Sequence, residues 1–217
     1  MAGFEKERKS RAHYEKRARL YDWANHIATV LRGTTGIRER RKAVRRLELK
    51  PGHSVLEVSV GTGTNLALIH EAVTANGKIV GLDISGHMLD RCREKLSRGR
   101  IGASLVTGEA GHLPFTSDRF DAVFHHGGIA EFGDRKAAID EMWRVTKPRG
   151  RLVICDAGRP TDRRLSMANQ FLMRFQPEYD LPPPMNLLPS EAQEVKLSWF
   201  HRGGWYLIEF RKPEAAS

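Results

Sequence analysis

A glycine-rich turn after an apolar run is the strongest chemical signal in this sequence of 217 residues. Val55–Val58 has the residue types of a strand, Ser59–Gly63 supplies small residues for a tight turn, and Asn65 begins an amphipathic segment. Backbone N–H groups in such a turn, with the positive end of the next helix, can bind a polar ligand. The turn lacks the Gly-Lys-Ser/Thr of a P-loop, and Leu66 stands where a dinucleotide site has its third glycine. A plain tight turn is the structural alternative.

An acidic residue, Asp83, follows the second predicted strand, Lys78–Leu82. A carboxylate at this edge of a sheet can accept hydrogen bonds from both hydroxyls of a ribose. Ile84 and Met88 follow at a spacing suited to packing on an adenine ring. Asp83 could alternatively cap the next helix, although Ser85 competes for that position. With the P-loop and dinucleotide sites set aside, S-adenosylmethionine (SAM) remains as the expected ligand.

A pair of histidines, His125 and His126, follows the predicted strand Phe120–Phe124. Imidazole ionises near neutral pH, so either side chain is a candidate general base. Successive side chains of a strand point to opposite faces, so at most one of them should reach a substrate. Packing or hydrogen bonding is the alternative role for each. No third residue stands at a metal-ligand spacing, so we expect no metal.

Predicted strands and helices alternate along the chain, a pattern typical of a parallel sheet covered on both faces. Two β-rich runs around Gly203-Gly204 then predict an antiparallel hairpin. We therefore predict an α/β fold with a Rossmann-like, doubly wound, seven-stranded sheet that is mostly parallel, a C-terminal antiparallel hairpin and an N-terminal helical cap. The predicted strands are Ser54–Val58, Lys78–Leu82, Ala103–Val106, Phe120–Phe124, Arg151–Cys155, Glu194–Phe200 and Trp205–Phe210, and the predicted helices after residue 50 are Asn65–Val73, His87–Leu96, Arg135–Val145 and Arg163–Phe175.

The positive charge of the chain is concentrated at its N-terminus. Residues 1–50 hold 15 of the 36 Lys and Arg residues but only 6 of the 26 Asp and Glu residues. Apolar residues at helical spacing predict two basic helices there, about 14–31 and 37–47, which we interpret as a cap over one domain, 51–217. Such a basic segment attracts phosphates, although a solvated helix face is the alternative. Without a signal sequence, a long apolar run or a disulfide framework, the chain is expected to be cytoplasmic.

Four motifs together resemble the class I SAM-dependent methyltransferases over about residues 50–156. They are the strand and turn Val55–Asn65, the acid Asp83, the stretch Gly108–Val123 with its Leu-Pro-Phe and Phe-Asp, and the stretch Arg144–Leu152. The resemblance implies that Glu57 braces the turn and that the backbone of Ser59–Gly63, including Gly61 and Gly63, holds the methionine moiety. It also implies that Asp83 binds ribose, that Glu109 and Ala110 address the adenine edge, and that His125 or His126 borders the transferred methyl.

The sequence departs from the family pattern at two positions. Ser59 replaces the first glycine of the turn motif, and Arg149 replaces a glycine in Lys-Pro-Gly-Gly. Serine is small, so we expect SAM to fit. Arg149 is expected in a surface turn.

The segment Tyr21-Asp22, followed by a basic helix, resembles the ubiquinone/menaquinone-type C-methyltransferases and related phospholipid and small-molecule methyltransferases. The resemblance implies methyl transfer from SAM to a small-molecule or lipid-like acceptor (quinone, amine or thiol), with S-adenosylhomocysteine as the product. The N-terminal helices would then close over SAM, and Tyr21 would line the acceptor pocket or serve only as a core contact.

Three other interpretations stay open. The basic N-terminus also fits an RNA methyltransferase or an RNA-binding module, but the segment after the fourth strand lacks the Asn-Pro-Pro-Tyr-like sequence of many base-modifying enzymes, so nucleic acid is less favoured. A SAM-binding protein without activity rests on Ser59 alone. The amphipathic first helix permits peripheral contact with an anionic membrane. The sequence does not indicate an oligomeric state.

Overall fold

The computed structural model describes residues 36–161, 164, 167, 170, 180–200 and 204–214. The first predicted helix, about 14–31, lies outside the described residues, and so does nearly all of the predicted helix Arg163–Phe175. The proposed division into a cap and a domain at residue 50 therefore stays a prediction.

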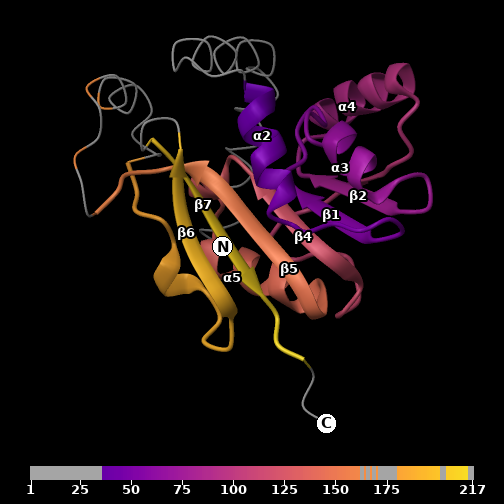
Figure 1. Cartoon of the computed structure of the whole chain (residues 1–217). Helices are drawn as coiled ribbons and strands as arrows, with labels where there is room; N and C mark the ends of the chain where they lie inside the picture. The colour runs from indigo at the N-terminus through magenta and orange to yellow at the C-terminus, as the bar shows by residue number, and fades with distance from the viewer. Residues whose placement is uncertain are drawn as a thin grey trace.

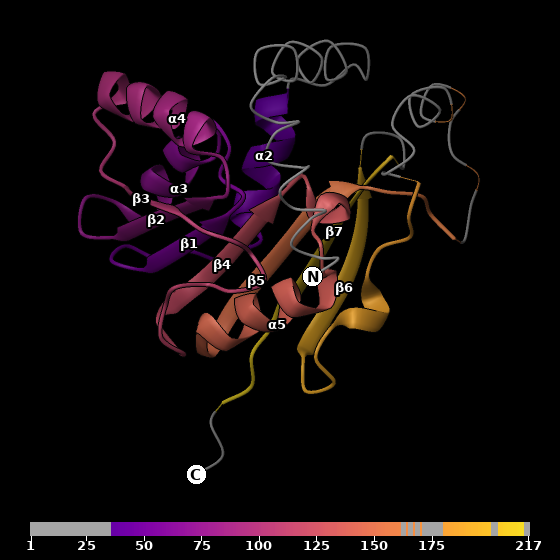
Figure 2. The same ribbon diagram turned by 180° about the vertical axis from the view of Figure 1, so that it is seen from behind.

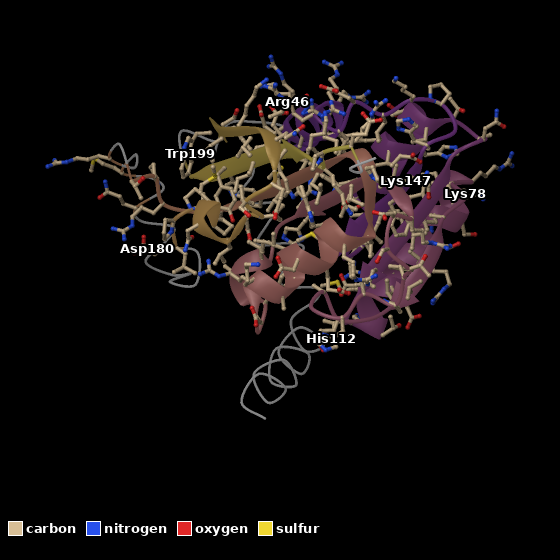
Figure 3. The ribbon with its side chains drawn as sticks, turned by 90° about the horizontal axis from the view of Figure 1, so that it is seen from below. Arg46, Lys78, His112, Lys147, Asp180 and Trp199 are labelled. Atoms are coloured by element: carbon tan, nitrogen blue, oxygen red, sulfur yellow. The ribbon has the colours of Figure 1, made fainter. Side chains whose placement is uncertain are left out.

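One seven-stranded sheet organises the described chain, in the order β3-β2-β1-β4-β5-β7-β6. Neighbouring strands from β3 to β5 are parallel, and β7 is antiparallel to both β5 and β6. Lys78, at the start of β2, and Trp199, in β6, accordingly lie toward opposite sides of the molecule when it is seen from below (Figure 3). The strands are β1 Ser54–Val58, β2 Lys78–Asp83, β3 Ser104–Thr107, β4 Phe120–His126, β5 Thr146–Ala157, β6 Gln193–Phe200 and β7 Trp205–Arg211.

Helices cover both faces of this sheet (Figures 1 and 2). Three of them, α2 Gly36–Arg45, α3 Leu66–Val73 and α4 Gly86–Gly99, pack on one face, and α5 Arg135–Val145 packs on the other. Two short 3-10 helices, η1 Ile129–Glu131 and η3 Met185–Leu187, lie in connecting segments. The predicted doubly wound fold and its C-terminal antiparallel pair are confirmed, and α2 confirms the second basic helix.

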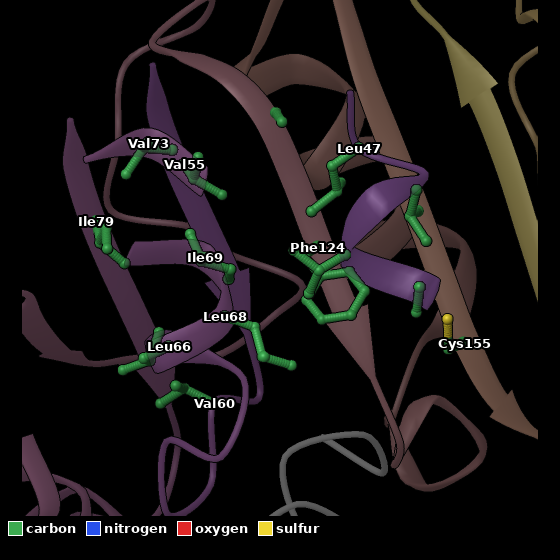
Figure 4. Packing of buried hydrophobic residues seen from close by; sticks show 14 of the residues in the cluster. Leu47, Val55, Val60, Leu66, Leu68, Ile69, Val73, Ile79, Phe124 and Cys155 are labelled. Atoms are coloured by element: carbon green, nitrogen blue, oxygen red, sulfur yellow. The ribbon is translucent and has the colours of Figure 1, made fainter. Parts of the chain in front are cut away.

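Each face of the sheet has its own hydrophobic core. On the face of α2, α3 and α4, side chains such as Leu47, Ile69 and Phe124 pack together with strand residues (Figure 4). On the other face, Ile139 and Met142 of α5 pack on the alternate side chains of the same strands. Alternate residues of the parallel strands face opposite cores, which explains why these strands are apolar almost throughout.

Charged side chains join the end of α2 to the antiparallel strands. Arg151 of β5 is buried, and its Nη2 lies 2.6 Å from Glu48 Oε1 and 3.0 Å from Glu194 Oε2. Its Nη1 lies 3.7 Å from Oε2 of Glu209, which is also buried. This ionic cluster lies in the first half of β5, where Arg151 pairs with Ala122 of β4 and Arg211 of β7, away from the edge at which the parallel strands end.

The main boundary difference concerns β5, which begins at Thr146 instead of the predicted Arg151. Thr146 already pairs with Phe120, and the N–H of Arg149 donates to the carbonyl of Lys212 at 3.0 Å. The Lys-Pro-Arg-Gly turn is thus incorporated into an irregular strand start by contacts with distant residues. The Arg149 side chain is exposed, as expected.

Candidate functional site

The parallel strands bring the predicted site residues to one edge of the sheet. Val58 of β1 is in register with Leu82 of β2 and with His125 of β4, and Asp83 is in register with Thr107. The residues that follow these strands must therefore emerge side by side at their carboxyl ends, where open α/β sheets bind ligands.

The turn after β1 contains alternating left-handed residues. The φ angles of Ser59, Gly61 and Gly63 are 59°, 54° and 73°. At Gly63 an added Cβ would lie 2.4 Å from the sulfur of Cys92 in α4, so a glycine is required by space as well as by φ. Ser59 adopts the same conformation with a Cβ, which costs about 1–2 kcal/mol. The serine thus preserves the shape of the turn at a cost in stability.

Glu57 braces this turn from inside the protein. Its Oε1 accepts a hydrogen bond from Asn65 Nδ2 at 2.5 Å, and Asn65 Oδ1 accepts one from Arg40 Nη1 at 2.9 Å. Among the described residues, Glu57 Oε2 has no hydrogen-bond partner although it is buried. Burial raises the pKa of Glu57 to about 8, and the Asn65 hydrogen bond opposes this rise. An acceptor oxygen buried without a partner suits a cationic or hydrogen-bond-donating ligand.

Asp83 holds the same turn from the end of β2. Its Oδ2 accepts from the N–H of Gly61 at 2.7 Å, and its Oδ1 accepts from the N–H of Ser85 at 2.9 Å. Ser85, not Asp83, caps α4, because its Oγ accepts from the N–H of Met88. Burial raises the pKa of Asp83, and the backbone hydrogen bonds oppose that rise. A carboxylate offers about four acceptor positions, so these hydrogen bonds leave room for the ribose contact, which stays a prediction.

The residues expected around adenine lie next to Asp83. The N–H of Gly108 donates to the carbonyl of Asp83 at 3.1 Å, which places the segment after β3 beside the end of β2. Glu109 and Ala110 are half-buried in that segment, Ile84 is half-buried, and Met88 is buried. The structure thus groups these four side chains at one edge, and their contacts with adenine stay a prediction.

The two histidines differ sharply in their surroundings. His125 is fully buried, its Nδ1 lies 3.1 Å from the carbonyl oxygen of Val58, and its ring packs edge-on against Phe132. Burial lowers the pKa of His125 to about 4, partly opposed by the hydrogen bond to Val58. His126 is half-buried, and its ring lies 5.1 Å from that of Trp205. The expectation that the pair points to opposite faces agrees with this contrast.

The structure adds three residues that sequence reasoning missed. Asn65 and Arg40 extend the contacts of Glu57, and Asp156 near the end of β5 is fully buried. Asp156 could have been predicted, because an acidic residue directly follows the apolar run Leu152–Cys155. No feature of the sequence predicts the contact between Arg40 and Asn65. Tyr21 lies outside the described residues, so its role stays a prediction.

The comparisons with known proteins agree with this geometry. Residues 4–180 match the model of the ubiE/COQ5 methyltransferase family. The chain belongs to this family. Membership confirms the predicted family and the predicted cofactor, SAM. None of the helices in the described part of the chain is long and apolar enough to cross a membrane.

Relatives named demethylmenaquinone methyltransferase include the proteins of two bacteria. The protein of Corynebacterium kroppenstedtii is 35% identical over 158 residues, which are 72% of this chain and 64% of that protein. The protein of Geobacillus stearothermophilus is 32% identical over 165 residues, which are 76% of this chain and 66% of that protein. The chain thus spans just under two thirds of the length of these relatives.

Solved structures share the fold at low sequence identity. A putative methyltransferase from Bacillus halodurans superposes with a TM-score of 0.66 and 17% identity, over 81% of this chain and 99% of that one. A phosphoethanolamine N-methyltransferase 2 from Haemonchus contortus, solved with S-adenosylhomocysteine, gives a TM-score of 0.68 and 16% identity, over 82% of this chain and 53% of that one. These likenesses support the fold.

Proposed function

We propose that this chain transfers the methyl group of SAM to a ring carbon of a demethylmenaquinone-like quinone in its reduced form, releasing S-adenosylhomocysteine. The binding of SAM, the methyl donor, is supported by one observation: the buried oxygen Glu57 Oε2 has no partner among the described residues. It lies behind a turn of left-handed residues that Asp83 also holds through the N–H of Gly61. The acceptor half is supported by relatives named for demethylmenaquinone. Those names favour a quinone over the amine, thiol and RNA alternatives.

Glu57, Asp83 and the turn between them would hold the donor. Ionised Glu57 places a negative charge behind the turn, opposite the positive charges that SAM carries. Asp83 offers lone pairs to ribose while it fixes the N–H of Gly61. When bound, SAM supplies a methyl group that its sulfonium already activates. The protein therefore has mainly to align the acceptor in line and to exclude water.

Three aromatic rings near the carboxyl ends of β4 and β5 support a planar acceptor. The ring of Trp205 lies 5.1 Å from His126 and 6.3 Å from Phe200, and all three side chains are half-buried. Trp205 pairs with Ala157, so these rings lie where β5 ends and β7 begins. Offset stacking between aromatic rings is favourable, and a quinone ring has the flat shape that it requires.

Carbon methylation also requires a group that removes a proton. As the new carbon–carbon bond forms and the carbon–sulfur bond breaks, the hydroquinone must lose one proton. His125 is buried, and its Nδ1–H donates to the carbonyl oxygen of Val58. Because burial lowers the pKa of His125 to about 4, its ring stays neutral near pH 7 and away from solvent. His126 is the more accessible of the two, and we assign it the role of base. Tyr21 stays a second candidate for the acceptor pocket.

Calorimetric titration with SAM tests the donor half. We expect micromolar binding by the native protein and at least a tenfold loss in Asp83→Ala, since the turn and the ribose contact both depend on this carboxylate. Asp90→Ala is the matched control, because Asp90 is an exposed acid on α4 that pairs only with Arg93 among the described residues. Equal affinity in all three proteins would refute the assigned site.

Mass spectrometry of reaction mixtures tests the acceptor half. Reduced short-chain demethylmenaquinone should gain one methyl group in the presence of SAM and native protein. A phospholipid amine, a small thiol and an RNA transcript serve as competing acceptors. Methylation of one of these, with none of the quinone, would refute the quinone proposal while leaving the donor site intact.

Peripheral contact with an anionic membrane remains a proposal for residues 1–35. Flotation with anionic vesicles should carry the full chain upward, and deletion of these residues should abolish that movement. Absence of flotation by the full chain would refute the contact.

A further inference from the structure

Asp156 is a fully buried carboxylate outside the donor site described above. It stands on β5, one residue before the end of the strand, in register with Tyr206 of β7. Its Oδ1 accepts a hydrogen bond from the N–H of Ala157 at 2.7 Å. Its Oδ2 accepts from Ile129 N–H at 2.7 Å and from Ala130 N–H at 3.4 Å. All of these donors are backbone groups, and two of them belong to the segment that follows β4.

That segment, residues 127–131, is shaped to reach Asp156. Gly127 and Gly128 have φ angles of 87° and 101°, which favour glycine, and η1 begins directly after them. The N–H of Gly127 donates to the carbonyl of Cys155 at 2.8 Å. The carboxylate thus accepts from the N–H groups of the first two residues of η1, which have no partner within that short helix. Ile129, the first residue of η1, is buried as a result.

The position of this turn relates it to the reaction. The turn follows His125 and His126 directly, and His125 is in register with Val58, the last residue before the glycine-rich turn of β1. Residues 127–131 therefore leave the sheet beside the donor turn. Under the proposed function the methyl acceptor would bind beside the donor turn, so a shift of this segment would change the shape of its binding site.

We propose that Asp156 is a positioning residue that holds the turn 127–131 in the shape required for binding the methyl acceptor. The inference rests on the proposed function, since it assumes an acceptor beside the donor turn. Asp156 itself does not touch the reacting atoms, because it is enclosed by backbone amides and by the core.

Among Asp156 and the two ionisable residues next to it, Tyr206 and Cys155, only Asp156 has a pKa near neutral pH. Burial raises the pKa of Asp156 to about 7, while the hydrogen bonds from Ala157 and from the turn oppose the rise. Tyr206 of β7 is in register with Asp156, and Cys155 precedes Asp156 on β5. Burial raises both of their pKa values well above the ordinary ones, so both stay neutral near pH 7. The positive charge of Arg135 in α5 lowers the pKa of Tyr206, but burial outweighs this effect. The anchor of the turn should therefore strengthen as Asp156 ionises around pH 7.

Asp156→Asn tests the inference with little change in volume. The amide retains one acceptor oxygen but presents an NH2 group to the remaining backbone donors. We expect KM for the quinone to rise roughly tenfold, because a small displacement of a positioning segment is costly, while Kd for SAM changes by less than about twofold. Glu209→Gln is the matched control. It alters another buried carboxylate, in the ionic cluster away from the site, and should leave KM for the quinone unchanged.

A second readout does not depend on the acceptor. In NMR spectra of the native protein, the amide signals of Ile129 and Ala130 should shift with pH with a midpoint near 7. The shift should vanish in Asp156→Asn and persist in Glu209→Gln. A native protein whose amides do not titrate, or an Asp156→Asn protein with unchanged KM, would overturn the inference. If the amides titrate but no quinone is methylated, the proposed function fails and the anchoring of the turn stands.

Discussion

Glu57 should release a proton when SAM binds. In the free protein burial raises its pKa to about 8, so the carboxyl group is about 90% protonated at pH 7. A cationic ligand beside the unpartnered Oε2 favours the ionised form, because opposite charges attract strongly where water is excluded. Binding at pH 7 should therefore release about 0.9 proton from this group.

Titration calorimetry in two buffers of different ionisation enthalpy measures this number. The difference between the apparent binding enthalpies gives the protons released per SAM molecule bound. Glu57→Gln keeps the oxygen that accepts from Asn65 and removes the ionisation, so it should release no proton at this position. Subtracting its value from that of the native protein also removes any proton exchange of the ligand itself.

The same substitution should change how stability depends on pH. An acid with a raised folded-state pKa stabilises the fold only while protonated, so stability falls as pH rises from about 4.5 to about 8. Over pH 5 to 8 this amounts to about 3 kcal/mol, which Glu57→Gln should remove, as measured by urea unfolding.

In the calorimetric experiment, equal proton release by the native protein and by Glu57→Gln would refute the argument, because Glu57 would then keep its charge state when SAM binds.

Three further predictions concern packing, titration and buried charge. Gly63→Ala should destabilise the fold by at least about 2 kcal/mol, because the added Cβ would lie 2.4 Å from the buried sulfur of Cys92. Gly61→Ala should cost less, because nothing lies within 4 Å of its added Cβ. Thermal unfolding of the two variants measures the difference. The imidazole signals of His125 should show no titration between pH 5.5 and pH 9, because burial lowers its pKa to about 4, and a midpoint near 6.5 in NMR spectra would contradict this. Arg151→Met should lower the free energy of unfolding by about 1–3 kcal/mol, since it leaves the buried carboxylate of Glu209 with only the half-exposed Arg46 as its ion-pair partner. No measurable loss in urea unfolding would show that the ionic cluster is not needed.

Much of the fold could be predicted because its signals are local. Apolar runs such as Val55–Val58 and Phe120–Phe124 mark buried parallel strands, and the glycines between strand and helix mark the turns. The boundaries of β5 could not be predicted in this way. Its first residues pair with Phe120 and Lys212, which are distant in sequence, and those contacts outweigh the local turn signal of Pro148.

The sequence by itself determined which residues would meet at the site. Parallel strands all end at one edge, so Glu57, Asp83 and His125 had to lie toward that edge once a parallel sheet was inferred. Only the tertiary structure decided their chemical states. Burial, which depends on everything packed around a side chain, raises the pKa of Glu57 and lowers that of His125. It also decided that Asp156 reaches the turn after β4, because that contact joins residues brought together only by the register of β4 on β5.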